Sequence, residues 1–153
     1  MAGSRASILR AIVQRVSSAR VEVEGKVVGQ IDKGLLILLG CQIGDSEVAA
    51  DKMVNRLARL RIFEDHQGLT NLDIFAAEGE ILLVSQFTLA ADLRKGNRPS
   101  FTTALAPEQA KELVRKVAQG LEGKGLKVES GVFGASMDVH SCNAGPATYL
   151  IEV

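Results

Sequence analysis

The feature that most limits the fold is a run of five aliphatic residues, Leu35–Leu39, enclosed by Gly34 and Gly40. The run is too short to cross a membrane, and it has no polar position that could face solvent. It therefore predicts a β-strand that is buried on both faces of its sheet. Whatever fold the chain adopts must supply a covering layer on each side of this strand.

The other hydrophobic patterns predict about seven or eight strands and two helices. One helix should begin after Asp45 or Ser46, which could cap it, and end near Arg59–Arg61. The second should begin at Pro107 and close at the glycines of residues 120–125. Strands are expected at residues 9–16, 21–24, 27–31, 34–40, 80–85, 127–130, 137–141 and 148–153, with a turn at 65–68.

Two helices cannot cover both faces of so many strands, so a second sheet layer should supply the missing cover. We therefore expect a mixed α/β fold in a single domain, with a β/β/α layered, barrel-like sheet and two main helices. The domain should span residues 9–153. Residues 1–8 are small and polar and lack the apolar core of a secretory signal, so they are interpreted as an extension or an expression remnant.

The composition excludes several classes of protein. Apolar residues make up 46% and charged residues 24%, which is typical of a globular chain and not of a disordered one. Because 18 Lys and Arg balance 18 Asp and Glu, any nucleic-acid contact needs a local basic patch. The best candidate is the loop that carries Arg94, Lys95 and Arg98. Two cysteines cannot form a disulfide framework, which favours a reducing, cytoplasmic setting.

No cofactor and no metal are expected. The chain has no glycine-rich phosphate-binding fingerprint. His140 and Cys142 would share a strand face, but zinc needs three or four ligands, and the chain has only two His and two Cys. Cys142 is instead expected to be a small buried thiol, and neither residue is given a role.

Two polar segments could carry chemistry. Ser85–Leu89 follows a predicted buried strand directly, and polar groups at such strand ends often form a site. Ser85 and Thr88 are possible nucleophiles without an evident base, and the alternative is that these hydroxyls only satisfy nearby backbone. The segment Asn143–Thr148 is either an ordinary tight turn or holds the Gly145–Pro146 bond in cis, so that backbone can approach a ligand closely.

Several short segments occur along the chain in a fixed order. Each segment alone is weak evidence for a protein family, but the ordered set is highly specific. The segments are Gln14-Arg15-Val16, Gly34-Leu35 with Leu38-Leu39-Gly40, Leu60–Phe63, Ser85–Leu89, Arg94-Lys95-Gly96 with Arg98–Phe101, Phe133-Gly134-Ala135 with Met137, and Asn143 with Gly145, Pro146 and Thr148. Together they resemble the D-aminoacyl-tRNA deacylase family in its bacterial and general eukaryotic form. The resemblance covers Leu9 to Val153.

The resemblance implies an ester hydrolase that proofreads translation. It would cleave the ester between a D-amino acid and the terminal adenosine of tRNA, remove glycine mischarged onto tRNA, and spare L-aminoacyl-tRNA. It implies a cytoplasmic homodimer whose partner is the aminoacylated 3′ end of tRNA, with no membrane involved. Gly145–Pro146 would be cis and would reach across the dimer interface into the pocket of the other subunit.

The resemblance also assigns roles within the site. Gln86 and Thr88 would lie near the scissile ester and Phe87 near the terminal adenosine, which makes these three the catalytic candidates. Because no base is visible beside Thr88, we expect backbone amides around Phe87 and Thr88, and not the Thr88 hydroxyl, to do the chemistry. The substrate-binding candidates are Ser85, Leu89, Met137, Asn143, Gly145, Pro146 and Thr148.

The chain departs from the family pattern at two positions. Ala144 stands where Asp is common and Ala147 where Val is common, and these changes could loosen the turn that rejects L substrates. The alternatives are a non-catalytic dimer that binds the acceptor end of tRNA, a relative whose substrate has drifted to L-alanyl-tRNA, and a purely structural dimer. The intact Ser85–Leu89 segment argues against the drifted relative.

Overall fold

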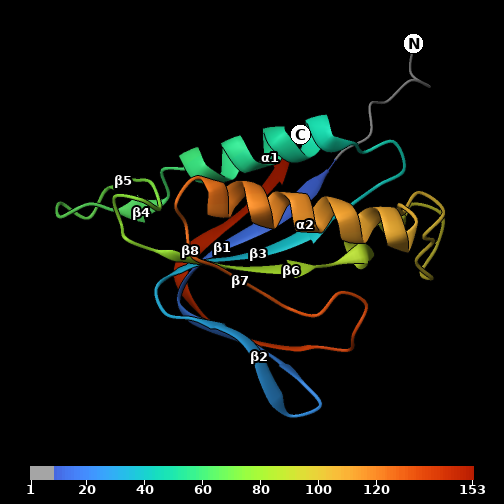
Figure 1. The fold of residues 1–153 in the computed structure, drawn as a ribbon, viewed down its shortest axis with the longest axis horizontal. Helices are drawn as coiled ribbons and strands as arrows, with labels where there is room; N and C mark the ends of the chain where they lie inside the picture. Colours follow the sequence, from blue (N-terminus) through green and yellow to red (C-terminus); the bar gives the residue numbers. More distant parts are fainter. Residues whose placement is uncertain (1–8) are drawn as a thin grey trace.

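The computed structural model describes residues 9–153, so the expected extension at 1–8 lies outside the described residues (Figure 1). The elements in chain order are β1 (Arg10–Val23), β2 (Lys26–Ile31), β3 (Gly34–Gly40), α1 (Glu47–Arg59), β4 (Phe63–Glu64), β5 (Thr70–Leu72), β6 (Glu80–Ser85), the 3₁₀ turn η1 (Phe87–Ala90), α2 (Pro107–Gly123), β7 (Val128–Ser130) and β8 (Asp138–Glu152). Within this part of the chain, every helix is too short or too polar to span a membrane.

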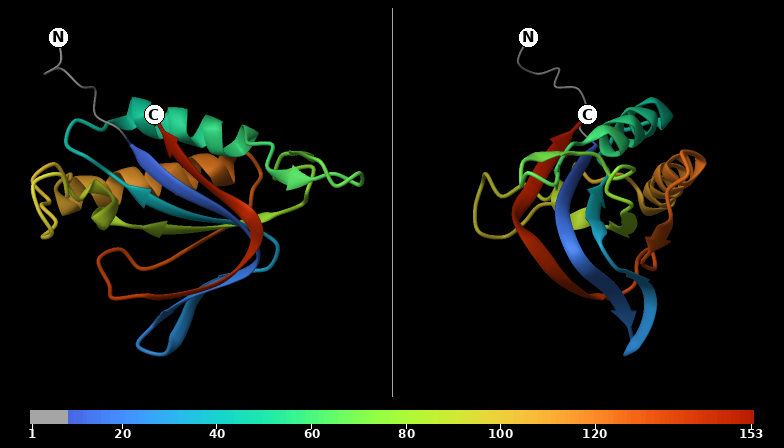
Figure 2. Two further views of the ribbon diagram at one scale, coloured as in Figure 1. Left: turned by 180° about the vertical axis from the view of Figure 1, so that it is seen from behind. Right: turned by 90° about the vertical axis from the view of Figure 1, so that its left-hand side faces the viewer.

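One strongly bent sheet of six strands is built around β1. The strand order is β2-β1-β3-β6-β7, and β8 also pairs with β1. The first half of β1 pairs with β3 and the second half with β2, while β8 follows β1 along both halves. The register between β1 and β8 is irregular from Gln14 to Ser18, where the two strands bend together away from the helices (Figure 2).

Two predicted strand boundaries are wrong. Ser17-Ser18 was expected to end the first strand, and residues 142–147 were expected to separate two late strands. Instead, β1 and β8 are each continuous through these segments, because they pair with each other across the bend, for example at Val16 and Asn143. A local pattern does not show this, since the strand partners of Val16 and Ser18 are Asn143 and Cys142, more than 100 positions away.

The layered arrangement is confirmed. Both helices lie on one face of the sheet, and the bent part of the same sheet covers the other face (Figure 2). The alternation along β3 follows from this, because Leu35 and Ile37 belong to the core under the helices, whereas Leu36 belongs to a second core inside the bend. The cover predicted for the second face is thus supplied by curvature of one sheet and not by a separate sheet.

The predicted helices begin where expected, at Glu47 and at Pro107. The predicted cap of the first helix is wrong, because Ser46 makes no side-chain hydrogen bond to the helix. Asp45 instead accepts a hydrogen bond from the backbone amide of Gln42, at 2.6 Å. This hydrogen bond joins two residues of the loop before α1, so it stabilises the loop and does not cap the helix.

Gly120 does not end the second helix, which continues to Gly123. A Cβ at residue 120 would lie 2.7 Å from Cγ2 of Val54 on α1. The missing side chain therefore lets the two helices pack closely. The expected turn at 65–68 is present and connects β4 to β5, a short hairpin that the pattern did not predict.

The two cysteines lie in different environments. Cys142 is exposed on β8, so the expectation of a buried thiol was wrong. Cys41 is buried, and its burial raises the pKa of its thiol to about 12, with a smaller contribution from Asp45. A thiol with such a pKa is inert as a nucleophile.

Candidate active site

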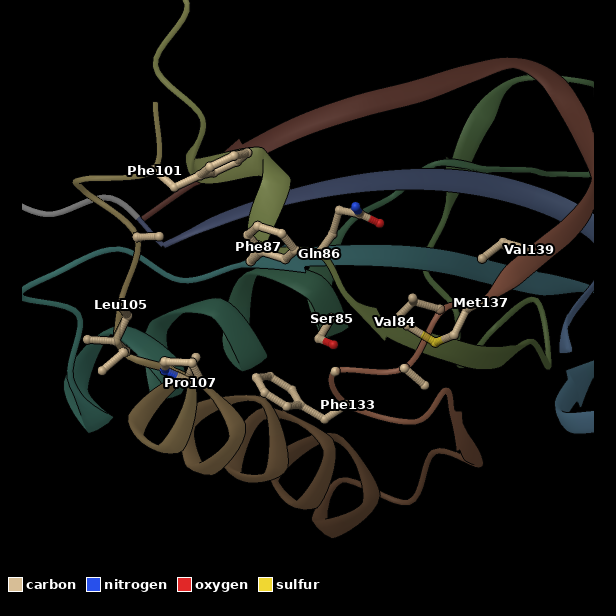
Figure 3. A pocket seen from close by; sticks show the side chains of 15 residues that line it. Val84, Ser85, Gln86, Phe87, Phe101, Leu105, Pro107, Phe133, Met137 and Val139 are labelled. Atoms are coloured by element: carbon tan, nitrogen blue, oxygen red, sulfur yellow. The ribbon is translucent and has the colours of Figure 1, made fainter. Parts of the chain in front are cut away.

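A cavity of about 550 Å³ lies at the carboxyl end of β6 (Figure 3). Its walls come from the end of β6, the start of η1, the segment before α2, the first turn of α2, the loop between β7 and β8, and the start of β8. The lining residues are Val84, Ser85, Gln86, Phe87, Phe101, Ala104, Leu105, Ala106, Pro107, Ala110, Phe133, Gly134, Ala135, Met137 and Val139.

None of the described residues that line this cavity has an ionisable side chain. The polar side chains are those of Ser85 and Gln86. His66 lies in the β4–β5 turn, and His140 sits 2.8 Å from a carboxylate oxygen of Glu22 on β1, outside the lining. Across residues 9–153, no group of three His, Cys, Asp or Glu gathers as a metal site would require. Within this lining, the groups that could take part in chemistry are the Ser85 hydroxyl, the Gln86 amide and backbone groups, together with groups of the ligand itself.

The turn η1 brings the predicted motif to the cavity. The chain leaves β6 at Ser85, and the amide of Gln86 donates a hydrogen bond to the carbonyl of Leu39 on β3, at 2.8 Å. The amide of Leu89 then donates to the carbonyl of Gln86, at 3.1 Å. Gly40 makes room for this, because a Cβ there would lie 2.6 Å from Cβ of Leu89. One missing side chain on β3 lets the turn lie against the sheet.

Thr88 contacts an amide and not a base. The side chain of Gln86 donates a hydrogen bond from Nε2 to Oγ1 of Thr88. A carboxamide cannot take the proton of a hydroxyl, so within the described residues no general base is bonded to Thr88. Ser85, Gln86 and Phe87 line the cavity, whereas Thr88 and Leu89 lie beside it.

The backbone of the turn leaves two donors available. Among the described residues, the amides of Phe87 and Thr88 donate no hydrogen bond, because Leu89 is the first amide of η1 that finds an acceptor. The opening amides of a helical turn lack partners within the turn for geometric reasons. These two N–H groups belong to the turn that begins in the cavity wall at Phe87, and N–H groups without a partner can stabilise a negatively charged oxygen.

An aromatic pair forms the mouth of the cavity (Figure 3). The ring centroids of Phe87 and Phe101 are 5.1 Å apart, with their planes tilted by 54°. Phe87 is 62% exposed and offers a ring face on which a base could stack. Phe101 follows the basic loop, whose base is closed by reciprocal backbone hydrogen bonds between Asp92 and Ser100 of 2.7 and 3.0 Å. The basic loop is therefore anchored beside the mouth.

The three cations of this loop are not equivalent. Arg94 forms a two-pronged ion pair with Asp92, in which Nε and Nη2 each lie 2.9 Å from a carboxylate oxygen. These hydrogen bonds hold the pKa of Asp92 well below its usual range and raise the pKa of Arg94. Lys95 and Arg98 are exposed, and in the described part of the chain neither forms an ion pair. Lys95 still lies near enough to Asp92 to lower the pKa of that carboxyl further, after the larger contribution of Arg94.

The Gly145–Pro146 bond is cis, as predicted. This bond lies in residues 144–147, which bulge out of the β1–β8 pairing and are called the Gly145–Pro146 loop below. Arg15 holds this loop, donating from Nε to the carbonyl of Ala144 at 2.8 Å and from Nη1 to the carbonyl of Ile62 at 2.9 Å. The side-chain amide of Asn143 donates to the carbonyl of Arg15, at 3.0 Å. This loop is thus fixed to β1 and to the chain before β4 by side chains that reach over the bend.

The same loop does not line the cavity of its own chain. Within the described lining, no residue comes from 143–148. Thr148 accepts a hydrogen bond from Gln14 at 3.2 Å, which ties it to β1. At the two positions that the resemblance marks as departures, the carbonyl of Ala144 accepts a hydrogen bond from Arg15 on β1 and the carbonyl of Ala147 accepts one from the side chain of Asn143. Backbone contacts of this kind do not depend on the side chain, so the two alanines retain them.

Sequence reasoning found one half of the cavity and missed the other. Ser85–Phe87 and Met137 were predicted, but Leu105 and Pro107 look like an ordinary helix start. Phe101 and Phe133 belonged to the resembling segments without being given a role, and their place in those segments could have identified them. Arg15 was missed in the same way, because its hydrogen bonds join distant parts of the chain.

The comparisons with known proteins agree on one family. Residues 12–152 match the family model described as D-Tyr-tRNA(Tyr) deacylase. The chain is 50% identical over 144 residues to the D-aminoacyl-tRNA deacylase of Aquifex aeolicus, which covers 94% of this chain and 97% of that protein. It is 51% identical over 145 residues to the same enzyme of Symbiobacterium thermophilum, covering 95% of this chain and 96% of that protein.

Solved structures show the same fold. A protein described as c-Myc DNA Unwinding Element Binding Protein superposes with a TM-score of 0.88 at 37% identity, covering 94% of this chain and 98% of that chain. A probable eukaryotic D-amino acid tRNA deacylase superposes with a TM-score of 0.83 at 17% identity, over 95% and 100% of the two chains, which supports the fold alone. Sequence match, relatives and fold together place this chain in the D-Tyr-tRNA(Tyr) deacylase family.

Proposed function

We propose that this chain hydrolyses the ester of D-aminoacyl-tRNA and releases the free D-amino acid and tRNA, which removes D-residues before translation can use them. The observation that carries the proposal is a cavity without ionisable side chains beside a turn with two available amides. An aminoacyl ester is already activated by its adjacent ammonium and by the neighbouring ribose hydroxyl. The protein then has mainly to orient water and stabilise the oxyanion. Such an enzyme acts where aminoacyl-tRNA is used, in the cytoplasm.

The arrangement of the site suggests a role for each group. The amides of Phe87 and Thr88 would receive the oxyanion that forms when water adds to the ester carbonyl. The ester C–O bond then breaks, and the proton lost by the water goes to the leaving ribose oxygen. Gln86 would orient the ester, and the exposed ring of Phe87 would stack on the terminal adenine. No step in this sequence requires a protein side chain to change its charge.

We propose that the Gly145–Pro146 loop of a second copy completes the cavity. The loop is exposed and held firmly by Arg15 and Asn143, yet it stands apart from its own cavity. Val139 on β8 is both part of the cavity wall and 38% exposed, so a second copy that covers this strand would also border the cavity. In such a homodimer, a rigid backbone wall would clash with an L side chain and admit a D side chain. Glycine has no side chain, so mischarged glycyl-tRNA would also be hydrolysed.

The test is to incubate the protein separately with D-tyrosyl-, L-tyrosyl- and glycyl-tRNA and to follow release of the amino acid. We expect hydrolysis of the D-tyrosyl and glycyl substrates and survival of the L-tyrosyl ester. Release of none of the three would leave only a protein that binds the acceptor end of tRNA. Release of all three would refute the selection by handedness.

Replacing Thr88 by Ala should leave substantial deacylase activity, because within the described residues its hydroxyl has no base, and its backbone amide is retained. We expect the single-turnover rate on D-tyrosyl-tRNA to fall by less than about tenfold, far less than the loss of a true nucleophile. A loss of several orders of magnitude with unchanged tRNA binding would show that Thr88 attacks the ester. Thr88→Ser, which keeps a hydroxyl, is the matched control.

Replacing both Lys95 and Arg98 by Gln should weaken tRNA binding and its dependence on salt. Each lost phosphate contact lowers the slope of log K against log salt by about 0.7–0.9, so we expect a decrease of about 1–2. Arg94→Gln should change the slope less, because Asp92 already neutralises that side chain. The measurement is tRNA affinity between low and physiological salt. Equal effects at all three positions, or no change in slope, would refute the proposed contact.

A further inference from the structure

We infer that Arg10, oriented by Glu152, is a positioning residue for the deacylation, because it holds the carbonyl end of the turn η1 against the sheet. The inference rests on the function proposed for the cavity. It gives a role in the reaction to an ion pair between the start of β1 and the end of β8, which lies outside the cavity lining.

The two edges of the Arg10 guanidinium have different partners. Nε and Nη2 each lie 2.9 Å from one carboxylate oxygen of Glu152. Nη1 donates a hydrogen bond to the backbone carbonyl of Leu89, at 3.0 Å. The planar fork of an arginine suits this double contact, because a carboxylate fixed on one edge sets the direction of the donors on the other. Glu152 therefore aims Arg10 at the turn.

The register of the sheet explains why these groups meet. Arg10 lies directly across from Glu152 on β8 and from Gly40 on β3. Residues that face each other across neighbouring strands share one face of the sheet. Gly40 is also the position whose missing side chain makes room for Leu89. Three aligned residues on neighbouring strands thus support the turn. Glu152 on β8 orients Arg10, Arg10 on β1 donates a hydrogen bond to the turn, and Gly40 on β3 leaves space for it.

The carbonyl end of the turn has two side-chain anchors among the described residues. Arg10 bonds the carbonyl of Leu89, and Oγ1 of Thr103 bonds the carbonyl of Ala90, at 3.1 Å. The other end of the same four-residue turn carries the available amides of Phe87 and Thr88. Without Arg10, Thr103 alone of these two anchors would hold that end, and because the turn has only four residues we expect it to tilt as a unit. Removing Arg10 should therefore misplace the donors that face the ester, while substrate contacts elsewhere in the cavity remain.

The test compares kinetic constants of the full-length protein on D-tyrosyl-tRNA. Arg10→Met keeps the length of the side chain without its donors, and we expect kcat to fall about tenfold with KM changed less than about twofold. Arg10→Lys should restore much of kcat, because an ammonium can still donate to the Leu89 carbonyl. Arg20→Met is the control: Arg20 lies on the same strand and pairs with Glu22 at 3.0 Å, so removing it should leave kcat unchanged.

The outcomes separate this inference from the function on which it rests. If the unaltered protein fails to hydrolyse D-tyrosyl-tRNA, the proposed function is wrong. If it is active and folded Arg10→Met keeps its kcat, or if Arg10→Lys is no better than Arg10→Met, the positioning role is wrong. Should Arg10→Met not fold, Glu152→Ala replaces it, because it removes the orienting carboxylate and leaves the arginine in place. We expect Glu152→Ala to lower kcat about threefold, and an unchanged kcat there would overturn the inference.

Discussion

Replacing Gly145 by Val is expected to lower the ratio of kcat/KM for D-tyrosyl-tRNA over L-tyrosyl-tRNA by at least about tenfold. A Cβ at this position would lie 2.6 Å from Oδ1 of Asn143. The side-chain amide of Asn143 donates to the carbonyls of Arg15 and Ala147, so displacing it removes one of the ties to β1 and leaves the loop held by Arg15 and Gln14. A loop that can yield no longer excludes the L side chain. The measurement is the rate of amino acid release from each charged tRNA.

Gly123→Val is the matched control for this change. Residue 123 ends α2, and a Cβ there would meet no atom within 4 Å. The added volume is the same, but it falls in open space, so we expect the ratio for the two substrates to match that of the unaltered protein. If Gly145→Val is folded and both of its rates are unchanged, the loop has no part in selecting the handedness of the substrate.

The strand β3 and both helices could be predicted from sequence, because the residue pattern of each segment fits only one type of secondary structure. An unbroken aliphatic run such as Leu35–Leu39 can only be buried, and the start at Pro107 fits a helix. The bend was not predictable in this way. The polar residues of β1 and β8 near Ser17-Ser18 resemble a loop, and only their pairing with each other makes them strand.

In the candidate site, too, the features that depend on neighbouring residues were predictable, and those that depend on distant residues were not. Ser85–Leu89 was identifiable because its polar residues follow a buried strand without a gap. The roles of Arg10 and Arg15 were not, because each reaches backbone carbonyls in segments 47 to 129 positions away. A single sequence places arginines near its start but does not say which carbonyl they will meet. The groups that support a site through distant backbone are therefore the ones that sequence reasoning misses.

Replacing Gly40 by Ala is expected to lower kcat/KM on D-tyrosyl-tRNA about a hundredfold, which is typical when a catalytic group moves by about 1 Å. The new Cβ would lie 2.6 Å from Cβ of Leu89 and 3.0 Å from the carbonyl of Gln86, so η1 must move away from β3. The backbone amides of the turn move with it. The measurement is the single-turnover rate per folded molecule, together with thermal unfolding.

Gly120→Ala separates this effect from a general loss of stability. A Cβ at residue 120 would clash with Val54 at 2.7 Å, nearly as close as the clash at residue 40, but between the two helices. Overpacking of this kind destabilises a protein by about 1–3 kcal/mol, so both variants should unfold at lower temperature. Only Gly40→Ala should lose activity per folded molecule. Equal activity losses in the two variants would show that the turn has no special place in the reaction.

The Gly145→Val and Gly40→Ala variants together test whether the loop acts on its own cavity or on that of a second copy. In a mixed dimer, one site would combine the unaltered cavity of the Gly145→Val chain with the unaltered loop of the Gly40→Ala chain. The other site would carry both defects. If the loop acts across the interface, mixed dimers isolated by two different tags should recover the D-over-L ratio of the unaltered protein, although the added Gly40→Ala chain is nearly inactive alone. If the loop acts within its own chain, the mixed dimers should keep the poor ratio of Gly145→Val. A chain that stays monomeric would exclude the arrangement altogether.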